Sequence, residues 1–179
     1  SGGKVICTNY YFNNTLKITK TLDSTSDVTL EEANAKGLKF KYVVTFAGKD
    51  ISAVNYDGSI EEIEFAEGNT VNPTVKSISL KTDNTLTFTM PAGKSLQLVK
   101  IPTGVSYTVK EEALVNDYYE DSVTAYAATP SDLSYTTATR TYSGSFATVT
   151  IGNHNHELGY TNKVTRSKGE LKITKNLAN

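Results

Sequence analysis

The sequence has 179 residues, 38% of them hydrophobic and 21% charged, with a formal net charge of −1. This size suits one domain with a sizeable core. The balanced charge argues against nucleic acid or an anionic membrane as a partner. No apolar run reaches membrane-spanning length and no signal-peptide pattern is found, although a mature secreted fragment would look the same.

Cys7 is the single cysteine of the sequence. One sulfur allows neither an internal disulfide nor a thiol-based metal site. Cys7 is therefore interpreted as a small apolar residue. If the protein is extracellular, any covalent reinforcement must use other chemistry.

Strand-like segments rich in Thr, Val, Ile, Tyr and Phe follow one another along the chain, separated by turn residues. Only "TLEEANAKG" at 29–37 is typical of a helix, with early acidic residues and Gly37 as its stop. Many short antiparallel strands predict an all-β sandwich with one short helical insertion. The predicted strands are 15–22, 38–48, 58–68, 75–82, 85–93, 95–104, 105–113, 119–128, 138–152 and 158–164.

A repeated phrase indicates that the chain is cut from a tandem array. "LKITK" occurs at 16–20 and again at 171–175, and each copy follows a strand-like segment that ends in Thr-Asn. Repetition of this kind is typical of arrays of like domains. We therefore expect three parts, which are the last strand of a preceding domain with a linker at 1–14, one complete domain at 15–164, and a linker with the first strand of a following domain at 165–179.

Three polar residues share the apolar phase of their strands. A β-strand points alternate side chains to opposite faces. Lys20 continues the face of Leu16 and Ile18, which is the face expected to be buried. Glu111 and Asn162 likewise fall in the apolar phase of their own strands.

Each of these residues has an ordinary explanation. A lysine near a strand end can reach solvent, a glutamate there is usually solvated, and an asparagine often satisfies turn backbone. The three together are harder to explain in this way, because burying charges without partners is very costly.

Buried together, the three side chains could react. Burial lowers the pKa of a lysine and raises that of a glutamate, so the pair can rest as neutral amine and neutral acid. A neutral Lys20 amine is a nucleophile toward the Asn162 carboxamide. A protonated Glu111 could polarise the carbonyl and pass a proton to departing ammonia. The predicted product is a Lys20–Asn162 isopeptide bond.

Three segments resemble a known family. They are "LKITKTL" at 16–22, "GKSLQLVKIPTGVSYTVKEE" at 93–112 and "GYTNKV" at 159–164. The sequence resembles, over about 15–164, the collagen-adhesin B-type (Cna B-like) domains in pilin shafts and adhesin stalks of Gram-positive bacteria, most of all a domain of major pilins. The resemblance implies an Ig-like β-sandwich. The insertions at 23–37 and 50–84 are less familiar.

The resemblance also implies a reacting trio. In that family, the lysine of the first strand, the glutamate of the "Y-x-V-x-E" strand and the asparagine of the closing "TN" react. These correspond to Lys20, Glu111 and Asn162. By the same logic Asn9 is the acceptor that remains from a preceding domain, and Lys175 is the nucleophile of a following one.

Other candidate sites are weaker. His154 and His156 in "NHNHE" could bind a metal, but no third ligand is evident, so this segment is interpreted as a polar loop before the last strand. Glu111 and Glu112 cannot flank one glycosidic bond, because adjacent strand residues face opposite ways. We therefore expect no cofactor, no metal and no enzyme beyond a single-turnover cross-link.

The predicted function is that of a structural domain in the shaft or stalk of a Gram-positive cell-surface pilin or adhesin. Its partners would be flanking domains or neighbouring pilin subunits, with no nucleic acid and no membrane insertion, and its location the extracellular, cell-wall-anchored surface. The alternative is an adhesin module that binds a host protein or glycan through 50–84 or 129–140. A hydrolase is a third class, for which no constellation is found.

Overall fold

The computed structural model describes residues 14–146 and 154–169. Asn9 and Lys175, the residues interpreted as remnants of neighbouring domains, lie outside this part of the chain, as does Cys7. Among the described residues, no helix has the length and apolar character needed to cross a membrane.

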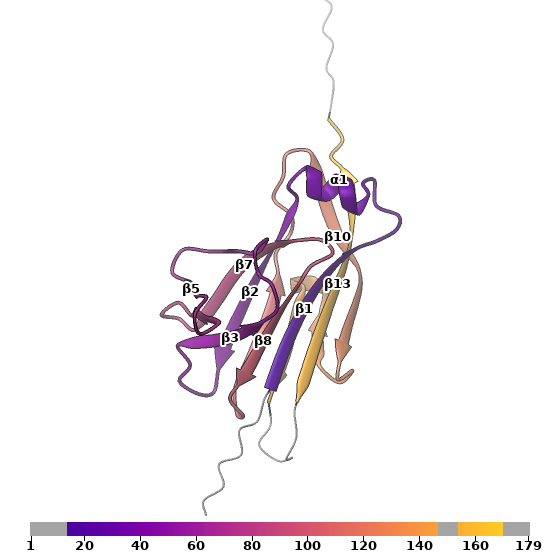
Figure 1. Cartoon of the computed structure of the whole chain (residues 1–179). Coiled ribbons are helices and arrows are strands. Elements are labelled where there is room, and N and C mark those ends of the chain that lie inside the picture. The colour runs from indigo at the N-terminus through magenta and orange to yellow at the C-terminus, as the bar shows by residue number, and fades with distance from the viewer. Residues whose placement is uncertain (1–13, 147–153, 170–179) are drawn as a thin grey trace, which may run out of the picture.

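The described chain is built almost entirely of strands, in agreement with the predicted all-β class (Figure 1). In chain order the elements are β1 (Asn14–Leu22), α1 (Leu30–Ala35), β2 (Lys39–Ala47), β3 (Ala53–Asp57), β4 (Glu64–Phe65), β5 (Val71–Asn72), β6 (Ser77–Ser79), β7 (Thr85–Pro91), β8 (Ser95–Ile101), β9 (Ser106–Glu111), β10 (Tyr119–Thr129), β11 (Ser134–Thr136), the 3-10 turn η1 (Thr137–Thr139), β12 (Thr141–Ser145) and β13 (Asn155–Arg166).

Two sheets pack face to face. The first has the strand order β10-β13-β1-β8-β3-β6-β5, and the second the order β11-β12-β9-β2-β7-β4. The first and last long strands, β1 and β13, are neighbours at the middle of the first sheet (Figure 1). They pair in parallel, which corrects the expectation of antiparallel strands throughout. The other strand pairs described in the two sheets are antiparallel.

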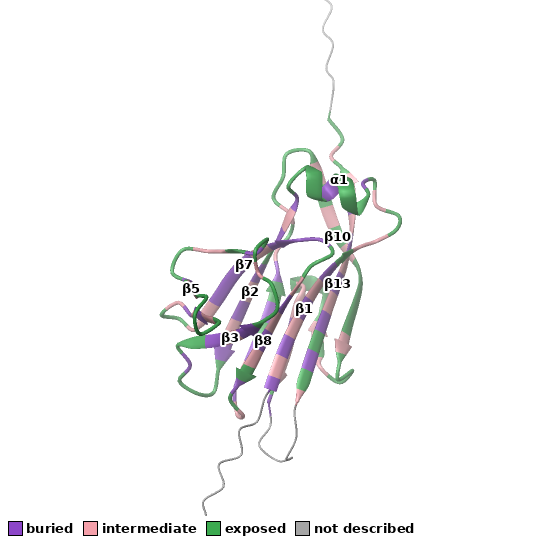
Figure 2. Ribbon diagram, viewed as in Figure 1, coloured by how far each residue is buried: buried purple, intermediate pink, exposed green. Residues whose placement is uncertain are grey.

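The core lies between the sheets and follows the alternation of each strand (Figure 2). In β1 every second residue from Asn14 to Lys20 is buried, and β9 and β13 show the same two-residue period. This period is that of a strand with one face against a core and one toward solvent.

The helix forms where the sequence predicted it. Thr29 caps α1 by accepting a hydrogen bond from the Glu32 backbone, and the Glu32 side chain accepts one from the Thr29 backbone. This capping box satisfies two otherwise unpaired backbone donors. Gly37 follows the helix with φ +67°, a conformation that glycine adopts without steric cost.

The predicted strand at 58–68 is wrong over most of its length. Only β4 forms there, because the chain turns at 60–63, where the Ile63 amide donates to the Ile60 carbonyl. Ile63 is buried and Ile60 partly buried, so this apolar pair is used by a turn. The strands β3, β5 and β11 were not predicted, and two of them have only two or three residues.

Candidate functional site

Lys20, Glu111 and Asn162 come together in the core. Lys20 lies on β1 and Asn162 on the adjacent parallel strand β13, where Asn162 is paired with Leu22, two residues along from Lys20. Both side chains therefore lie on the inner face of the first sheet. Glu111 ends β9 in the second sheet and meets them from across the core.

Glu111 contacts both of the other side chains. The Lys20 Nζ donates to Glu111 Oε2 at 2.9 Å, and the Asn162 Nδ2 donates to Glu111 Oε1. Each of the three residues has 0% exposed surface. One carboxyl group thus bridges an amine and an amide in a site closed to solvent.

The contact between Glu111 and Asn162 differs from the expected one. The sequence-based hypothesis had Glu111 bonded so as to polarise the Asn162 carbonyl, whereas the bond is to the amide nitrogen. Among the described residues, the buried Asn162 Oδ1 has no hydrogen-bond partner. The carboxamide is therefore held through Nδ2, the atom that would leave if the amine attacked.

Aromatic rings line the site. The Lys20 Nζ lies 4.2 Å from the centroid of the Phe40 ring, an attractive cation–π contact. The Tyr42 hydroxyl donates to Glu111 Oε2 at 2.8 Å, and the Tyr42 ring packs edge-on against Tyr160. These rings exclude water from around the amine and the carboxyl group.

Burial changes the acid–base behaviour of Lys20. Removal from water lowers the pKa of Lys20 from about 10.5 to about 8, although the charge of Glu111 acts in the opposite direction. Near neutral pH a substantial fraction of Lys20 can therefore be the free amine. A free amine is the nucleophilic form.

Sequence reasoning missed a second carboxylate at the site. Asp121 on β10 accepts a hydrogen bond from the Asn162 Nδ2 through Oδ2, and its side chain is 1% exposed. Arg140 donates from Nη1 to Asp121 Oδ2 at 2.9 Å and to Glu111 Oε1 at 3.2 Å. Asp121 shares its strand phase with Val123 and Tyr119, and this phase was the available signal.

Arg140 itself gave no pattern in the sequence. It follows η1 in a left-handed conformation, with φ +53°, which directs its side chain by a turn and not by strand alternation. Burial raises the pKa of Asp121, but the hydrogen bonds from Arg140 and from the Leu114 amide outweigh it and hold the pKa below its usual value. Asp121 is therefore an ionised carboxylate.

The two other sequence candidates do not form a site. Glu112 is partly exposed and pairs with Lys41 at the surface. His156 belongs to β13, which corrects the expected loop, and its Nδ1 bonds the Tyr107 hydroxyl at 2.7 Å in the core. Within the part of the chain that the structure describes, no group of three or more His, Cys, Asp or Glu residues could hold a metal.

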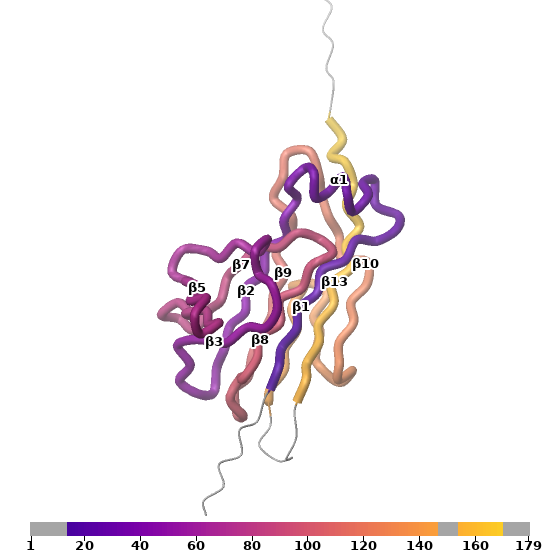
Figure 3. The backbone as a smooth tube through the Cα atoms, viewed as in Figure 1, coloured from indigo at the N-terminus to yellow at the C-terminus, as the bar shows by residue number. Residues whose placement is uncertain are grey.

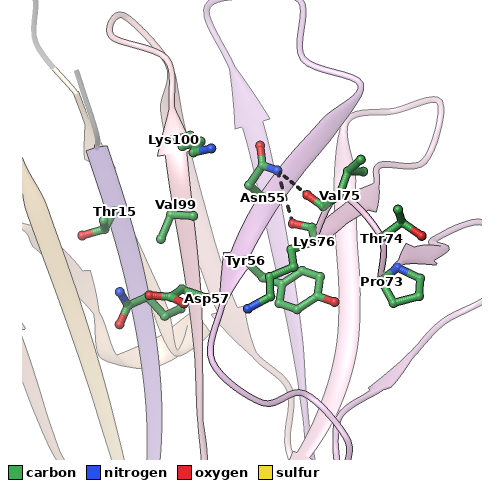
Figure 4. Close-up of a pocket in the computed structure, with 11 residues that line it drawn as sticks. Thr15, Asn55, Tyr56, Asp57, Pro73, Thr74, Val75, Lys76, Val99 and Lys100 are labelled. Atoms are coloured by element: carbon green, nitrogen blue, oxygen red, sulfur yellow. Dashed lines mark hydrogen bonds between the residues drawn. The ribbon is translucent and has the colours of Figure 1, made fainter. Parts of the chain in front are cut away.

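A groove of about 610 Å³ lies beside β3 and β8, partly lined by the 73–76 turn of the inserted segment (Figure 4). Its lining includes Asp57 and Lys100, of opposite charge. Asn55 also faces it, but its Nδ2 donates to the carbonyls of Val75 and Lys76, so this amide holds the turn (Figure 4).

The fold and this site define a two-sheet β-sandwich with a buried Lys–Glu–Asn trio between its sheets. Residues 14–163 match the model of a family described as a domain of unknown function, DUF7601. The chain belongs to this family. No curated protein matches it.

Solved structures with a similar fold include proteins of pili. A mutant of the major pilin from Streptococcus pyogenes is 18% identical, with a TM-score of 0.48 and 86% of this chain covered. The pilus-presented adhesin Cpa is 18% identical, with a TM-score of 0.47 and 83% covered. An adhesin from Mobiluncus mulieris, containing intramolecular disulfide, isopeptide and ester bond cross-links, is 17% identical, with a TM-score of 0.43 and 88% covered.

This chain spans only part of those proteins. It covers 49% of the pilin chain, 27% of the Cpa chain and 42% of the Mobiluncus chain. At this level of identity the likeness concerns the fold.

Proposed function

We propose that this domain is a structural unit of a shaft or stalk in a Gram-positive cell-surface pilin or adhesin, and that it stabilises itself with a Lys20–Asn162 isopeptide bond promoted by Glu111. The observation that carries the proposal is that one buried carboxyl group contacts both Lys20 Nζ and Asn162 Nδ2. These are the nucleophilic atom and the leaving atom of an amide exchange.

The geometry supports a stepwise reaction. Lys20 gives one proton to Glu111 Oε2 and becomes a free amine. The bond from Lys20 Nζ to Asn162 Cγ then forms, which leaves positive charge on Nζ and negative charge on Oδ1. Proximity replaces a bimolecular encounter, since both side chains are fixed on neighbouring strands.

Glu111 then completes the transfer. Its Oε1 gives a proton to Nδ2, which has a free lone pair once Cγ is tetrahedral, and its Oε2 takes a proton from Nζ. The Cγ–Nδ2 bond breaks, the carbonyl re-forms and ammonia leaves. The product amide is neutral, and Glu111 ends as the acid that it was at the moment of attack.

The bond would stabilise the domain in two ways. It closes a loop that includes nearly the whole domain, which by the chain-entropy estimate for cross-links contributes roughly 5 kcal/mol. It also replaces a buried ammonium by a neutral amide, which removes the cost of keeping that charge out of water.

The domain would work in a tandem array. On this proposal 15–164 is one unit, 1–14 and 165–179 are parts of its neighbours, and Asn9 and Lys175 would react with residues of those neighbours. The partners would be flanking domains or pilin subunits at an extracellular, cell-wall-anchored surface. The repeat of "LKITK" at 16–20 and 171–175 supports this arrangement.

Intact mass spectrometry tests the cross-link directly. The natural chain should be lighter than its calculated mass by one ammonia, while Lys20→Ala and Glu111→Ala should each have the full calculated mass. Lys41→Ala is a matched control, because Lys41 pairs with Glu112 at the surface, and it should keep the deficit. A natural chain of full mass after complete folding would refute the cross-link.

The alternative of ligand binding has weaker support. Its one observation is the groove beside β3 and β8, which has a mixed polar lining. The groove residue Asn55 is already bonded to the turn backbone, and the buried trio would have no role in binding. The stalk function accounts for both the trio and its burial.

A further inference from the structure

Asp121 and Arg140 are buried or half-buried charged groups that the reaction above does not use. The Asp121 side chain is 1% exposed and that of Arg140 18% exposed. Keeping such groups from water costs free energy unless they are paired. The two are paired with each other, and both also contact the reacting residues.

The two carboxylates of the site contact different atoms. Glu111 bonds Lys20 Nζ with one oxygen and Asn162 Nδ2 with the other, which suits a group that moves a proton between the two nitrogens. Asp121 accepts from Asn162 Nδ2 and from the Arg140 guanidinium. Asp121 therefore contacts the leaving nitrogen as a fixed negative charge.

We propose that Asp121 is a second catalytic carboxylate of the cross-linking site, which binds the leaving nitrogen of Asn162, and that Arg140 is its positioning residue. This inference rests on the proposed cross-link. It adds a division of roles, in which Glu111 carries the proton and Asp121 stays ionised throughout.

The leaving nitrogen gives Asp121 its first role. Nδ2 is neutral in the carboxamide and becomes positive when it takes the proton from Glu111, just before the Cγ–Nδ2 bond breaks. A fixed negative charge within hydrogen-bond distance stabilises that developing charge in a water-free site. The same contact orients the carboxamide before attack, because Asp121 and Glu111 together take up its nitrogen side.

Charge balance gives Asp121 its second role. Lys20, Arg140, Glu111 and Asp121 carry no net charge when all are ionised. One proton moved from Lys20 to Glu111 leaves the Arg140–Asp121 pair still balanced. Without Asp121, the Arg140 cation would be balanced by Glu111 alone, which favours negative charge on Glu111 and opposes its uptake of the Lys20 proton.

The test measures how fast the bond forms in the full chain. Each variant is made by pulsed cell-free synthesis, and the fraction that has lost one ammonia is followed by intact mass spectrometry. Asp121→Asn keeps the size and removes the charge, so bond formation should slow on the order of 100-fold. Glu120→Gln is the matched control, because Glu120 precedes Asp121 on the exposed phase of β10, and its rate should equal that of the natural chain.

A double variant separates this role from a merely structural one. Asp121→Asn/Arg140→Gln removes both charges, so it has no unbalanced cation and should form the bond faster than Asp121→Asn alone, although more slowly than the natural chain. Loss of structure alone predicts that the double variant is no faster than the single one. The double variant also decides the matter if Asp121→Asn fails to fold.

The outcomes distinguish the two proposals. A natural chain that forms the bond, with Asp121→Asn at the same rate, overturns the role of Asp121 and leaves the cross-link intact. A double variant no faster than Asp121→Asn overturns the charge-balance role. A folded natural chain that never loses ammonia overturns the cross-link itself, and with it this inference.

Discussion

Lys20 is the residue at which the chemistry of this domain is concentrated. Its ammonium group would be costly in a site with no exposed surface. Glu111 and the ring of Phe40 reduce this cost, and loss of the proton removes it. The features that make Lys20 expensive to bury also make its free amine accessible near neutral pH, since burial lowers its pKa to about 8.

Asn162→Ala should show a stability that rises with pH, because it keeps Lys20 but has no carboxamide to react. The folded Lys20 pKa of about 8 lies below the unfolded value of about 10.5, so the unfolded chain binds more protons between these values. Stability is then lower below pH 8 and should rise from about pH 8 toward pH 10.5, by at most about 1.4 kcal/mol per pH unit for one proton. Urea unfolding across this window measures the slope.

The control for this prediction is Asn162→Ala/Lys20→Met. It retains the buried tyrosines Tyr42 and Tyr160, whose own titration therefore cancels when the two variants are compared. The double variant should lack the rise that Lys20 causes. Equal slopes in the two variants would contradict a lowered pKa for Lys20.

At the scale of the strands, sequence alternation carried much of the information. Strand alternation places Lys20, Glu111 and Asn162 on core-facing positions, and all three are buried. This works because a two-residue period determines the face of a side chain whatever its chemistry. The helix was predictable for a similarly local reason, since Thr29 and Glu32 form a capping box.

Other features depend on contacts distant in the sequence. The parallel pairing of β1 with β13 joins the two ends of the domain, and no local pattern encodes it. Asp121 was overlooked because β10 is an edge strand whose phase is only partly buried, so its apolar signal is weak. Arg140 reaches the site from a turn with positive φ, which alternation cannot describe.

Gly144→Ala in β12 should destabilise the domain by about 1–3 kcal/mol, as overpacking does in a filled core. A Cβ there would lie 2.6 Å from the Tyr107 hydroxyl and 2.8 Å from Leu133 Cδ2. Tyr107 cannot move freely, because its hydroxyl is bonded to His156. Chemical denaturation of the two proteins measures the difference.

Gly159→Ala is the matched control on β13. Its Cβ would have Ala127 Cβ as the nearest side-chain atom, at 3.8 Å, which is an ordinary contact. The expected change is within about 0.5 kcal/mol. Equal losses in Gly144→Ala and Gly159→Ala would show that the tight contact at Gly144 does not matter.

At the scale of the whole molecule, the described chain enters at one end of the sandwich and leaves at the other (Figure 3). β1 and β13, the strands at these two ends of the chain, lie side by side and parallel. Tension applied to the chain ends would therefore load the β1–β13 ladder in shear. A covalent bond from Lys20 to Asn162 would connect these two strands at the point where the load is carried.

The natural chain should therefore resist extension in a single-molecule pulling experiment. With the proposed bond in place, force passes from β1 through Lys20 and Asn162 into β13, and the residues between them stay folded. In Lys20→Ala the same load should unfold the domain and release on the order of 500 Å of chain, given about 3.5 Å for each extended residue. Lys41→Ala should behave as the natural chain does. A full-length extension of the natural chain at the force that unfolds Lys20→Ala would contradict a load-bearing cross-link, whatever its measured mass.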